Sequence, residues 1–169
     1  QRVGVGPGPV QRLPQHAGRL GAGNPVAPVQ HEARHRLDAA RAGLGLVGAV
    51  QSLTRPGGAA TLHGPAPVDD DNNPIAPADA YGHDHLWFLD RMVRSDQPLV
   101  ERMALVFHDW FATSNANVSR QQQLIDQSNL FRSACFGSFL DLFKAVTVDP
   151  AMLQWLNGAV NTKQAPNEN

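Results

Sequence analysis

His108 is the residue of this sequence whose type and position favour chemistry most. On a helix it shares a face with Glu101, two turns earlier, and its neighbours on that face, Ala104 and Ala112, are small. A histidine and a carboxylate in a small-sided pocket can transfer protons or bind a metal ion. Seven residues of helix span about 10 Å, so we expect no direct contact between the two. The structural alternative is a buried His108 bonded to a neighbouring helix.

His83 and His85 look like a metal-ligand pair at first sight. Successive residues of a helix turn by about 100°, so side chains two apart point to nearly opposite faces and cannot share an ion. We expect His85 to be a hydrogen-bonded core histidine, because it falls on an apolar arc with Phe88 and Leu89. We expect His83 to be accessible to solvent. His108 and His83 remain the candidate metal ligands, and no cofactor is evident.

Asp69, Asp71 and Asn73 resemble the start of a calcium-binding loop, in which alternate oxygen ligands converge on the ion. The rest of the signature fails, because Pro74 stands where a glycine is needed and Ala80 where a bidentate glutamate belongs. We therefore interpret the segment as an acidic surface turn.

The composition excludes several classes of protein. The formal net charge is −1 and no basic stripe is interleaved with aromatic residues, so we expect no nucleic-acid partner. No apolar run reaches the roughly 18 residues of a membrane-spanning helix, so we expect no membrane span. Cys135 is the only cysteine, which excludes an internal disulfide and favours a small core residue over a nucleophile. Motifs such as G-x-S-x-G and H-E-x-x-H are absent, and whether the chain is an enzyme stays open.

Apolar residues recur at helical spacing from Leu44 onward, and no stretch alternates as a strand would. The predicted fold is all-α, an irregular helical bundle or array. The first three expected helices cover about 44–53, Asp79 to about Arg94, and Leu99 to Thr113. The fourth begins at Ser119, with Gln122 in its capping box, and ends at about Gly137. The last two run from Ser138, with Asp141, to about Val146 and from Asp149-Pro150 to about Gly158.

The helix from Leu99 to Thr113 carries an apolar stripe that includes Met103, Phe107 and Trp110. We expect one continuous helix with Phe107 and Trp110 buried. His108 should lie on a different face from the stripe.

Residues 1–42 differ in composition from the rest. They have no aromatic residue and only two acids, so they cannot bury enough apolar surface to offset the entropy of ordering. We interpret them as a disordered or non-native leader that makes few contacts, and residues 43–169 as a partial α-helical domain. His31 and His35 are four apart there, with His16 further away, and we interpret these histidines as solvated.

Several ordered motifs carry a family resemblance. They are Gly82-His83-Asp84-His85-Leu86-Trp87-Phe88-Leu89-Asp90-Arg91-Met92, Pro98 to Met103 running into Phe107-His108-Asp109-Trp110-Phe111, Asp149-Pro150-Ala151-Met152-Leu153, and Ala165-Pro166-Asn167-Glu168-Asn169. Through these motifs, the sequence from about Leu44 to Asn169 resembles a bacterial family catalogued as domain of unknown function 1800. Residues before about Ala42 do not look like the usual start of that family.

The resemblance implies an exported or periplasmic protein whose gene lies near one for a sulfatase-like protein, and it establishes no activity. Members commonly have a second histidine at the position of Trp110. Our hypothesis is a binding or assembly component of the cell envelope. The alternative is a metal-dependent hydrolase that uses His108 with Glu168.

The resemblance also implies that more of the domain normally follows Asn169. We therefore expect an incomplete fragment whose aromatic faces are partly uncovered, and which binds hydrophobic dyes and associates. The large residues concerned are Trp87, Phe107, Trp110, Phe131, Phe139, Phe143 and Trp155.

Overall fold

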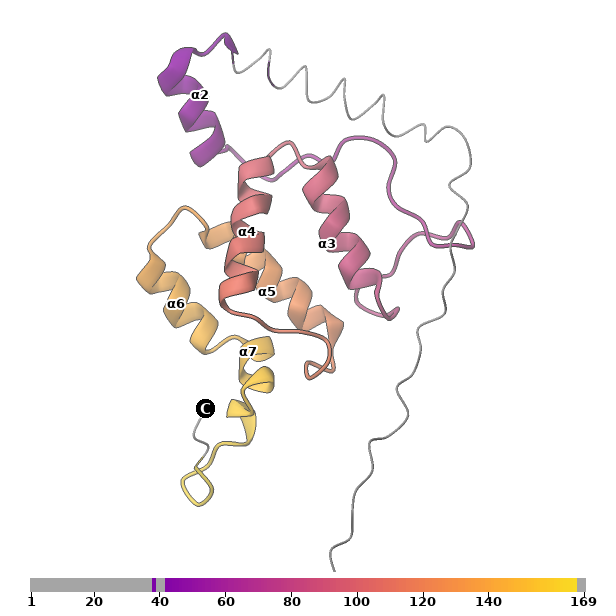
Figure 1. The fold of residues 1–169 in the computed structure, drawn as a ribbon, viewed down its shortest axis with the longest axis vertical. Coiled ribbons are helices and arrows are strands. Elements are labelled where there is room, and N and C mark those ends of the chain that lie inside the picture. Colours follow the sequence, from indigo (N-terminus) through magenta and orange to yellow (C-terminus); the bar gives the residue numbers. More distant parts are fainter. Residues whose placement is uncertain (1–37, 39–41, 167–169) are drawn as a thin grey trace, which may run out of the picture.

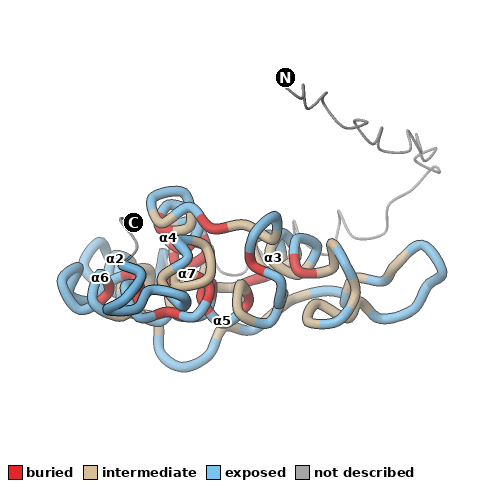
Figure 2. The backbone as a smooth tube through the Cα atoms, turned by 90° about the horizontal axis from the view of Figure 1, so that it is seen from below, coloured by how far each residue is buried: buried red, intermediate tan, exposed pale blue. Residues whose placement is uncertain are grey.

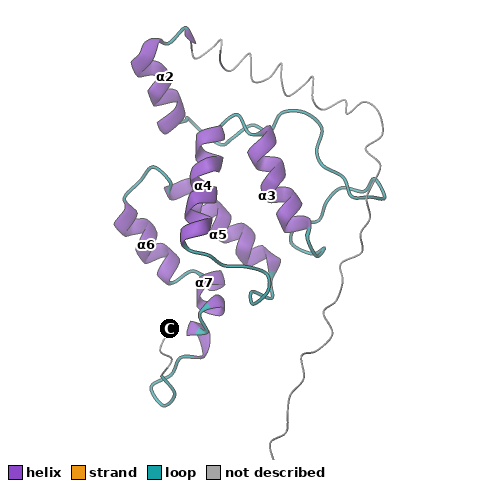
Figure 3. Cartoon of the chain, viewed as in Figure 1, coloured by secondary structure: helices purple, strands orange, loops and turns teal. Residues whose placement is uncertain are grey.

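The computed structural model describes Asp38 and residues 42–166, and this part of the chain contains helices and no strand, so the predicted all-α class is confirmed. The helices are α2 (Gly45–Thr54), α3 (His83–Arg94), α4 (Pro98–Trp110), α5 (Gln121–Ala134), α6 (Phe139–Thr147), α7 (Pro150–Trp155) and the 3₁₀ helix η1 (Gly158–Val160). Loops and turns connect them (Figure 3). Among the described residues, no helix is both long enough and apolar enough to cross a membrane.

The helices α4 and α5 form the centre of the fold and pack against each other. In Figure 1, α3 flanks this pair on one side and α6 on the other, while α7 lies below and α2 projects above. Figure 2 shows the buried positions gathered along the central helices and the exposed ones on the outer turns. The resulting bundle is irregular, as the sequence predicts.

The core joins the middle of α4 to α5 and α6. Its buried apolar residues are Val100, Ala104, Phe107, Phe131, Cys135, Leu142 and Val146. Cys135 is buried and donates from its thiol to the carbonyl oxygen of Arg132, and burial raises the pKa of this thiol. A neutral, buried thiol agrees with the prediction that Cys135 is a core residue.

Two of the predicted helix caps form as expected. The Ser138 side chain accepts a hydrogen bond from the amide of Asp141, and Asp149 accepts one from the amide of Met152. Each satisfies one of the free amides of a first helical turn.

Two other predicted caps are wrong. Helix α3 begins at His83 rather than after Asp79, because Gly82 adopts a left-handed conformation with φ of 83° and interrupts any earlier helix. Helix α5 begins at Gln121, directly after Arg120, and has no side-chain cap, while Ser119 accepts a hydrogen bond from Gln154. In both places the tertiary path of the chain overrides the local signal.

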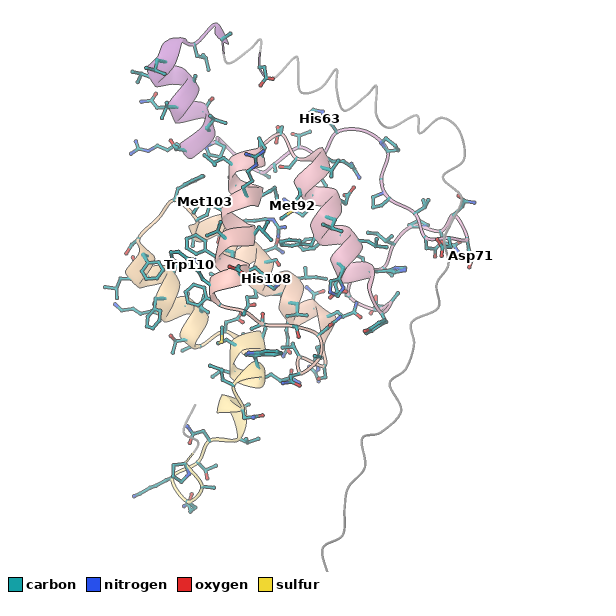
Figure 4. All side chains as sticks on the ribbon, in the orientation of Figure 1. His63, Asp71, Met92, Met103, His108 and Trp110 are labelled. Carbon is teal, nitrogen blue, oxygen red and sulfur yellow. The ribbon has the colours of Figure 1, made fainter. Side chains whose placement is uncertain are left out.

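The buried face of α4 differs from the predicted stripe. The helix is continuous and Phe107 is buried, but Trp110 is 64% exposed, so its predicted burial is wrong. Ala104 is fully buried beneath α5 and lets the two helices approach closely, which rotates Trp110 outward toward α6. The expected separation of His108 from Trp110 is confirmed, since the two point to opposite sides of α4 in Figure 4.

The segment at Asp69 forms the expected acidic turn. The Asp69 carboxylate accepts hydrogen bonds from the amides of Asp71 and Asn73, and a short antiparallel bridge joins Val68 to Pro74. The amide of Asn73 is the main reason that the pKa of Asp69 is lowered. Asp71 lies at the tip of this turn, well away from the helices (Figure 4). The expectations for residues 1–42, including His16, His31 and His35, lie outside the described residues apart from Asp38 and Ala42.

Candidate functional site

His108 lies in the last turn of α4, half-buried between two aromatic rings. Its ring centroid is 5.8 Å from that of Phe88 on α3 and 6.4 Å from that of Phe131 on α5. Burial lowers the pKa of His108, the charge of nearby His85 lowers it further, and Asp109 opposes these effects. The neutral imidazole that results at neutral pH has one nitrogen free to accept a proton or bind a metal ion.

A pocket of about 290 Å³ opens beside His108, lined by residues of α3, α4, α5 and the loop that follows α4. Most of its wall is apolar, with contributions from Phe88, Leu89 and Ile125. The polar groups in the wall are few and include Asp84 and Asn115. An apolar pocket with a few convergent polar groups is the usual form of a small-molecule site.

Two polar atoms in this pocket lack a hydrogen-bond partner among the described residues. They are Oδ1 of Asp84 and Nδ2 of Asn115, and both are buried. Asp84 Oδ1 lies 3.1 Å from Nδ1 of His85, but the contact does not have the alignment of a hydrogen bond. Buried polar groups in native proteins are nearly always paired, so two unpaired ones in one pocket mark a place where a ligand or water can bind.

The structure contradicts the prediction for one of the two histidines of α3, His85. His85 is exposed rather than buried in the core, because α3 packs on α4 and α5 through the side that carries Asp84 and Phe88. His83 is half-buried, so part of it is accessible to solvent, and its Nδ1 accepts a hydrogen bond from the amide of Ala76. The segment before α3 folds back over His83, which the sequence pattern does not reveal.

Glu101 does not contribute to the pocket beside His108. It is 1% exposed, and its Oε2 accepts a hydrogen bond of 2.8 Å from Nε of Arg132. Its Oε1 lies 3.3 Å from Nε of Arg91. The two guanidinium groups also flank the ring of Trp87, at 4.8 Å for Arg132 and 5.6 Å for Arg91. Glu101 is therefore a buried ion-pair residue that holds α3, α4 and α5 together.

The candidate metal ligands do not come together. Among the described residues, no group of three or more His, Cys, Asp and Glu side chains is arranged to hold a metal ion. His108 and His83 lie in different surroundings. His108 lines the pocket, whereas His83 accepts a hydrogen bond from the amide of Ala76. Glu168, the partner of His108 in the hydrolase hypothesis, lies outside the described residues.

The sequence analysis missed Asp84, Asn115, Arg91 and Arg132 as site residues. Asp84 stands between His83 and His85, and its position in the sequence does not indicate that it lines a pocket. Arg132 follows Phe131 on α5 and carried a signal, since a charged residue beside buried positions of a helix requires a partner. Asn115 lies in an irregular loop, where no periodicity indicates which side chains turn inward.

Comparison with known proteins identifies the family alone. No curated protein and no solved structure is similar enough to the chain to count as a match. The family described as "Protein of unknown function (DUF1800)" matches residues 3–169. This match starts earlier than the resemblance seen from about Leu44, so it includes most of the segment that we set apart as a leader, and the domain boundary at 42/43 stays a prediction. Because the match covers nearly the whole chain, the protein belongs to the DUF1800 family.

Proposed function

We propose that this chain is a binding component of the bacterial cell envelope and that its ligand site is the pocket beside His108. The observation that carries the proposal is that Asp84 Oδ1 and Asn115 Nδ2, on two residues that line a mostly apolar pocket, are buried without a hydrogen-bond partner among the described residues. The location in the envelope is supported by the family resemblance.

The two unpaired atoms indicate what kind of ligand fits. The Asp84 carboxylate requires a hydrogen-bond donor and attracts a positive charge, while the Asn115 amide requires an acceptor. An engineered cavity of about 150 Å³ holds benzene, so a pocket of about 290 Å³ can hold a ring with a short polar group. The ligand we propose is a small apolar amine that also bears a carbonyl group.

Phenylalaninamide has these features and serves as the probe. Calorimetric titration should show binding to the unchanged chain, and Asp84→Asn should weaken it about tenfold or more, since a hydrogen bond to a charged group contributes about 1.5–3 kcal/mol. Asp126→Asn is the matched control, because Asp126 is exposed on α5 and does not line the pocket. Equal affinity in the chain and in Asp84→Asn would exclude this site.

The assembly part of the proposal is supported by exposed aromatic residues on α4 and α6. The aromatic patch consists of Trp110, Phe139, Leu140 and Phe143, each more than half exposed. Trp110 and Phe139 meet edge to face with centroids 6.1 Å apart, and Phe139 lies 6.4 Å from Phe143. Contiguous apolar surface of this kind is typical of protein contacts. We propose it as the contact surface for the sulfatase-like partner that the family resemblance implies, which copurification would test.

A second candidate function is metal-dependent hydrolysis with His108 and Glu168. It is favoured by the lowered pKa of His108, because only neutral imidazole binds a metal ion or accepts a proton. Equilibrium dialysis against Zn²⁺ tests it. Stoichiometric metal that is lost in both His108→Ala and Glu168→Gln would support this function, and metal retained in either variant would contradict it.

A further inference from the structure

A second pocket, of about 560 Å³, lies where the segment after α2 crosses the end of α3, the start of α4 and the end of α5. It is separate from the pocket beside His108, and the two share no lining residue. Its wall contains three arginines, Arg55, Arg91 and Arg132, and one acid, Glu101. The polar residues Gln97, Asn129 and Ser133 also line the pocket.

The charges in this pocket do not balance. Glu101 is shared between Arg91 and Arg132, so one carboxylate faces two guanidinium groups. Arg55 lines the pocket and forms no ion pair with any residue that the structure describes. The lining therefore has an excess of two positive charges in a partly enclosed space, where charge interactions are stronger than in bulk water.

The hydrogen-bonding capacity of the arginines is also unfilled. Nη2 of Arg132 and Nε of Arg91 are buried without a hydrogen-bond partner among the described residues. The Arg132 side chain is only 7% exposed, and burial lowers the pKa of its guanidinium group while Glu101 opposes that effect. Arginine stays protonated in proteins, so Nη2 of Arg132 is a charged donor without an acceptor, while Nε of Arg91 has only its 3.3 Å ion-pair contact with Glu101.

We propose that this pocket binds a phosphoryl group carrying two negative charges, as free phosphate or as a phosphate monoester. A phosphoryl group has about −1.5 to −2 charges at neutral pH, which matches the excess of two, whereas a monocarboxylate would neutralise only one. Its oxygens accept from several donors at once, as a lining of guanidinium, amide and hydroxyl groups requires. The volume of the pocket leaves room for a small polar group esterified to the phosphate.

Glu101 has a positioning role in this account. Its carboxylate is buried behind the arginines and fixes the direction of both guanidinium groups, which lowers the entropy lost when they bind an anion. The stacking of Arg132 over Trp87 restricts the same side chain.

The test is calorimetric titration of the whole chain with inorganic phosphate and with glycerol 3-phosphate at fixed salt. Both should bind, and acetate should bind at least about tenfold more weakly, because it has one charge. Arg55→Gln should weaken phosphate binding about tenfold, as loss of one charged hydrogen bond does. Arg55 is exposed, so this variant does not endanger the fold.

Arg91→Gln tests the inner part of the pocket, since Glu101 keeps its bond to Arg132 in this variant. It should also weaken phosphate binding about tenfold, while Arg120→Gln, an exposed arginine outside the pocket, should leave it unchanged. Vesicles containing phosphatidic acid distinguish the two sources of a phosphate monoester. Retention of the chain on the vesicles would identify a lipid headgroup as the ligand. Binding of glycerol 3-phosphate without such retention would identify a soluble ester. No phosphate binding, acetate binding as tight as phosphate, or equal affinity in all three variants would overturn the proposal.

Discussion

Glu101 and His108 share one side of α4, yet their side chains line different pockets and form no hydrogen bond or ion pair with each other. Glu101 is held by Arg91 and Arg132, while His108 packs between Phe88 and Phe131. Their common face therefore serves two separate sites. Glu101 belongs to the arginine pocket and His108 to the pocket with the unpaired Asp84.

The first prediction concerns the stability that Glu101 provides. Glu101→Ala leaves two largely buried guanidinium groups without their carboxylate, and removing one partner of a buried pair costs about 3–5 kcal/mol. Urea unfolding should show this loss. The matched control, Asp109→Ala, removes an exposed acid of the same helix and should change the free energy of unfolding by less than about 0.5 kcal/mol. Similar small effects in both variants would show that the ion cluster contributes little.

The second prediction concerns a buried hydrogen-bond network at Gln127. Thr113 donates to Oε1 of Gln127, and Nε2 of Gln127 donates to Asp149 at 2.7 Å. Gln127 thereby ties the loop after α4 to the cap of α7. Gln127→Leu removes both hydrogen bonds and leaves the buried Thr113 hydroxyl without its partner, while Asp149 keeps its bond from the amide of Met152, so the free energy of unfolding should fall by about 1–3 kcal/mol.

Gln122→Leu is the control for this network. Gln122 lies on the same helix, is exposed and donates a hydrogen bond to the exposed Asp126, so its replacement should be nearly neutral. Chemical denaturation of the two variants side by side measures the difference in their free energies of unfolding. An equal effect of the two substitutions would show that the hydrogen-bond network at Gln127 does not stabilise the fold.

The third prediction concerns pH. Burial lowers the pKa of His108 below its ordinary value of 6.5, so below about pH 6.5 the unfolded chain binds a proton that the folded chain does not. The stability associated with neutral His108 is therefore complete above pH 6.5 and declines as the pH falls toward the lowered pKa. His108→Gln should remove this part of the pH dependence in unfolding experiments at a series of pH values.

His85→Gln provides a directional check on the same group. The charge of His85 lowers the pKa of His108, so this exposed substitution should raise the pKa of His108. Burial, the larger cause, remains, and the pKa should stay below 6.5. Titration of the histidine ring signals by NMR measures both values, and an unchanged or lower pKa of His108 would contradict the assignment.

The fourth prediction concerns the aromatic patch. Three of its four residues, Trp110, Phe139 and Phe143, belong to the aromatic faces that we expected to be partly uncovered, although Trp110 itself was expected to be buried. The chain should bind a hydrophobic dye and associate at high concentration. Leu140→Gln with Phe143→Gln should reduce both, whereas Val160→Gln, exposed but outside the patch, should not. Dye fluorescence and sedimentation velocity measure these effects. A chain that stays monomeric and does not bind the dye would contradict the prediction.

The sequence predicts the helices well because each has its own local signal. Ser138 and Asp149 each accept a hydrogen bond from an amide of the first turn that follows them, and Asp149 does so although Gln127 also donates to it. Ser119 is not a cap because α5 begins at Gln121, directly after Arg120, and the Ser119 hydroxyl accepts from Gln154 instead. Local patterns predict that a helix forms but do not fix the residue at which it begins.

The sites were less predictable for a related reason. Periodicity indicated that Phe107 and His108 lie on different sides of α4, but the side that α5 covers depends on the small Ala104 and not on the widest apolar stripe. Because α5 packs on the side of α4 that carries Ala104, Trp110 is exposed. The unpaired state of Asp84 and Asn115 arises only when three helices and a loop meet, which no spacing in the sequence specifies.

The most direct test of the proposed binding site is an NMR titration of the ¹⁵N-labelled chain with phenylalaninamide. The side-chain amide signal of Asn115 and the ring signals of His108 should shift together with one dissociation constant, because both residues line the same pocket. The side-chain amide signal of Asn129, which lines the arginine pocket, should stay in place. Shifts centred on Asn129, or no shift of Asn115 at millimolar ligand, would contradict the account.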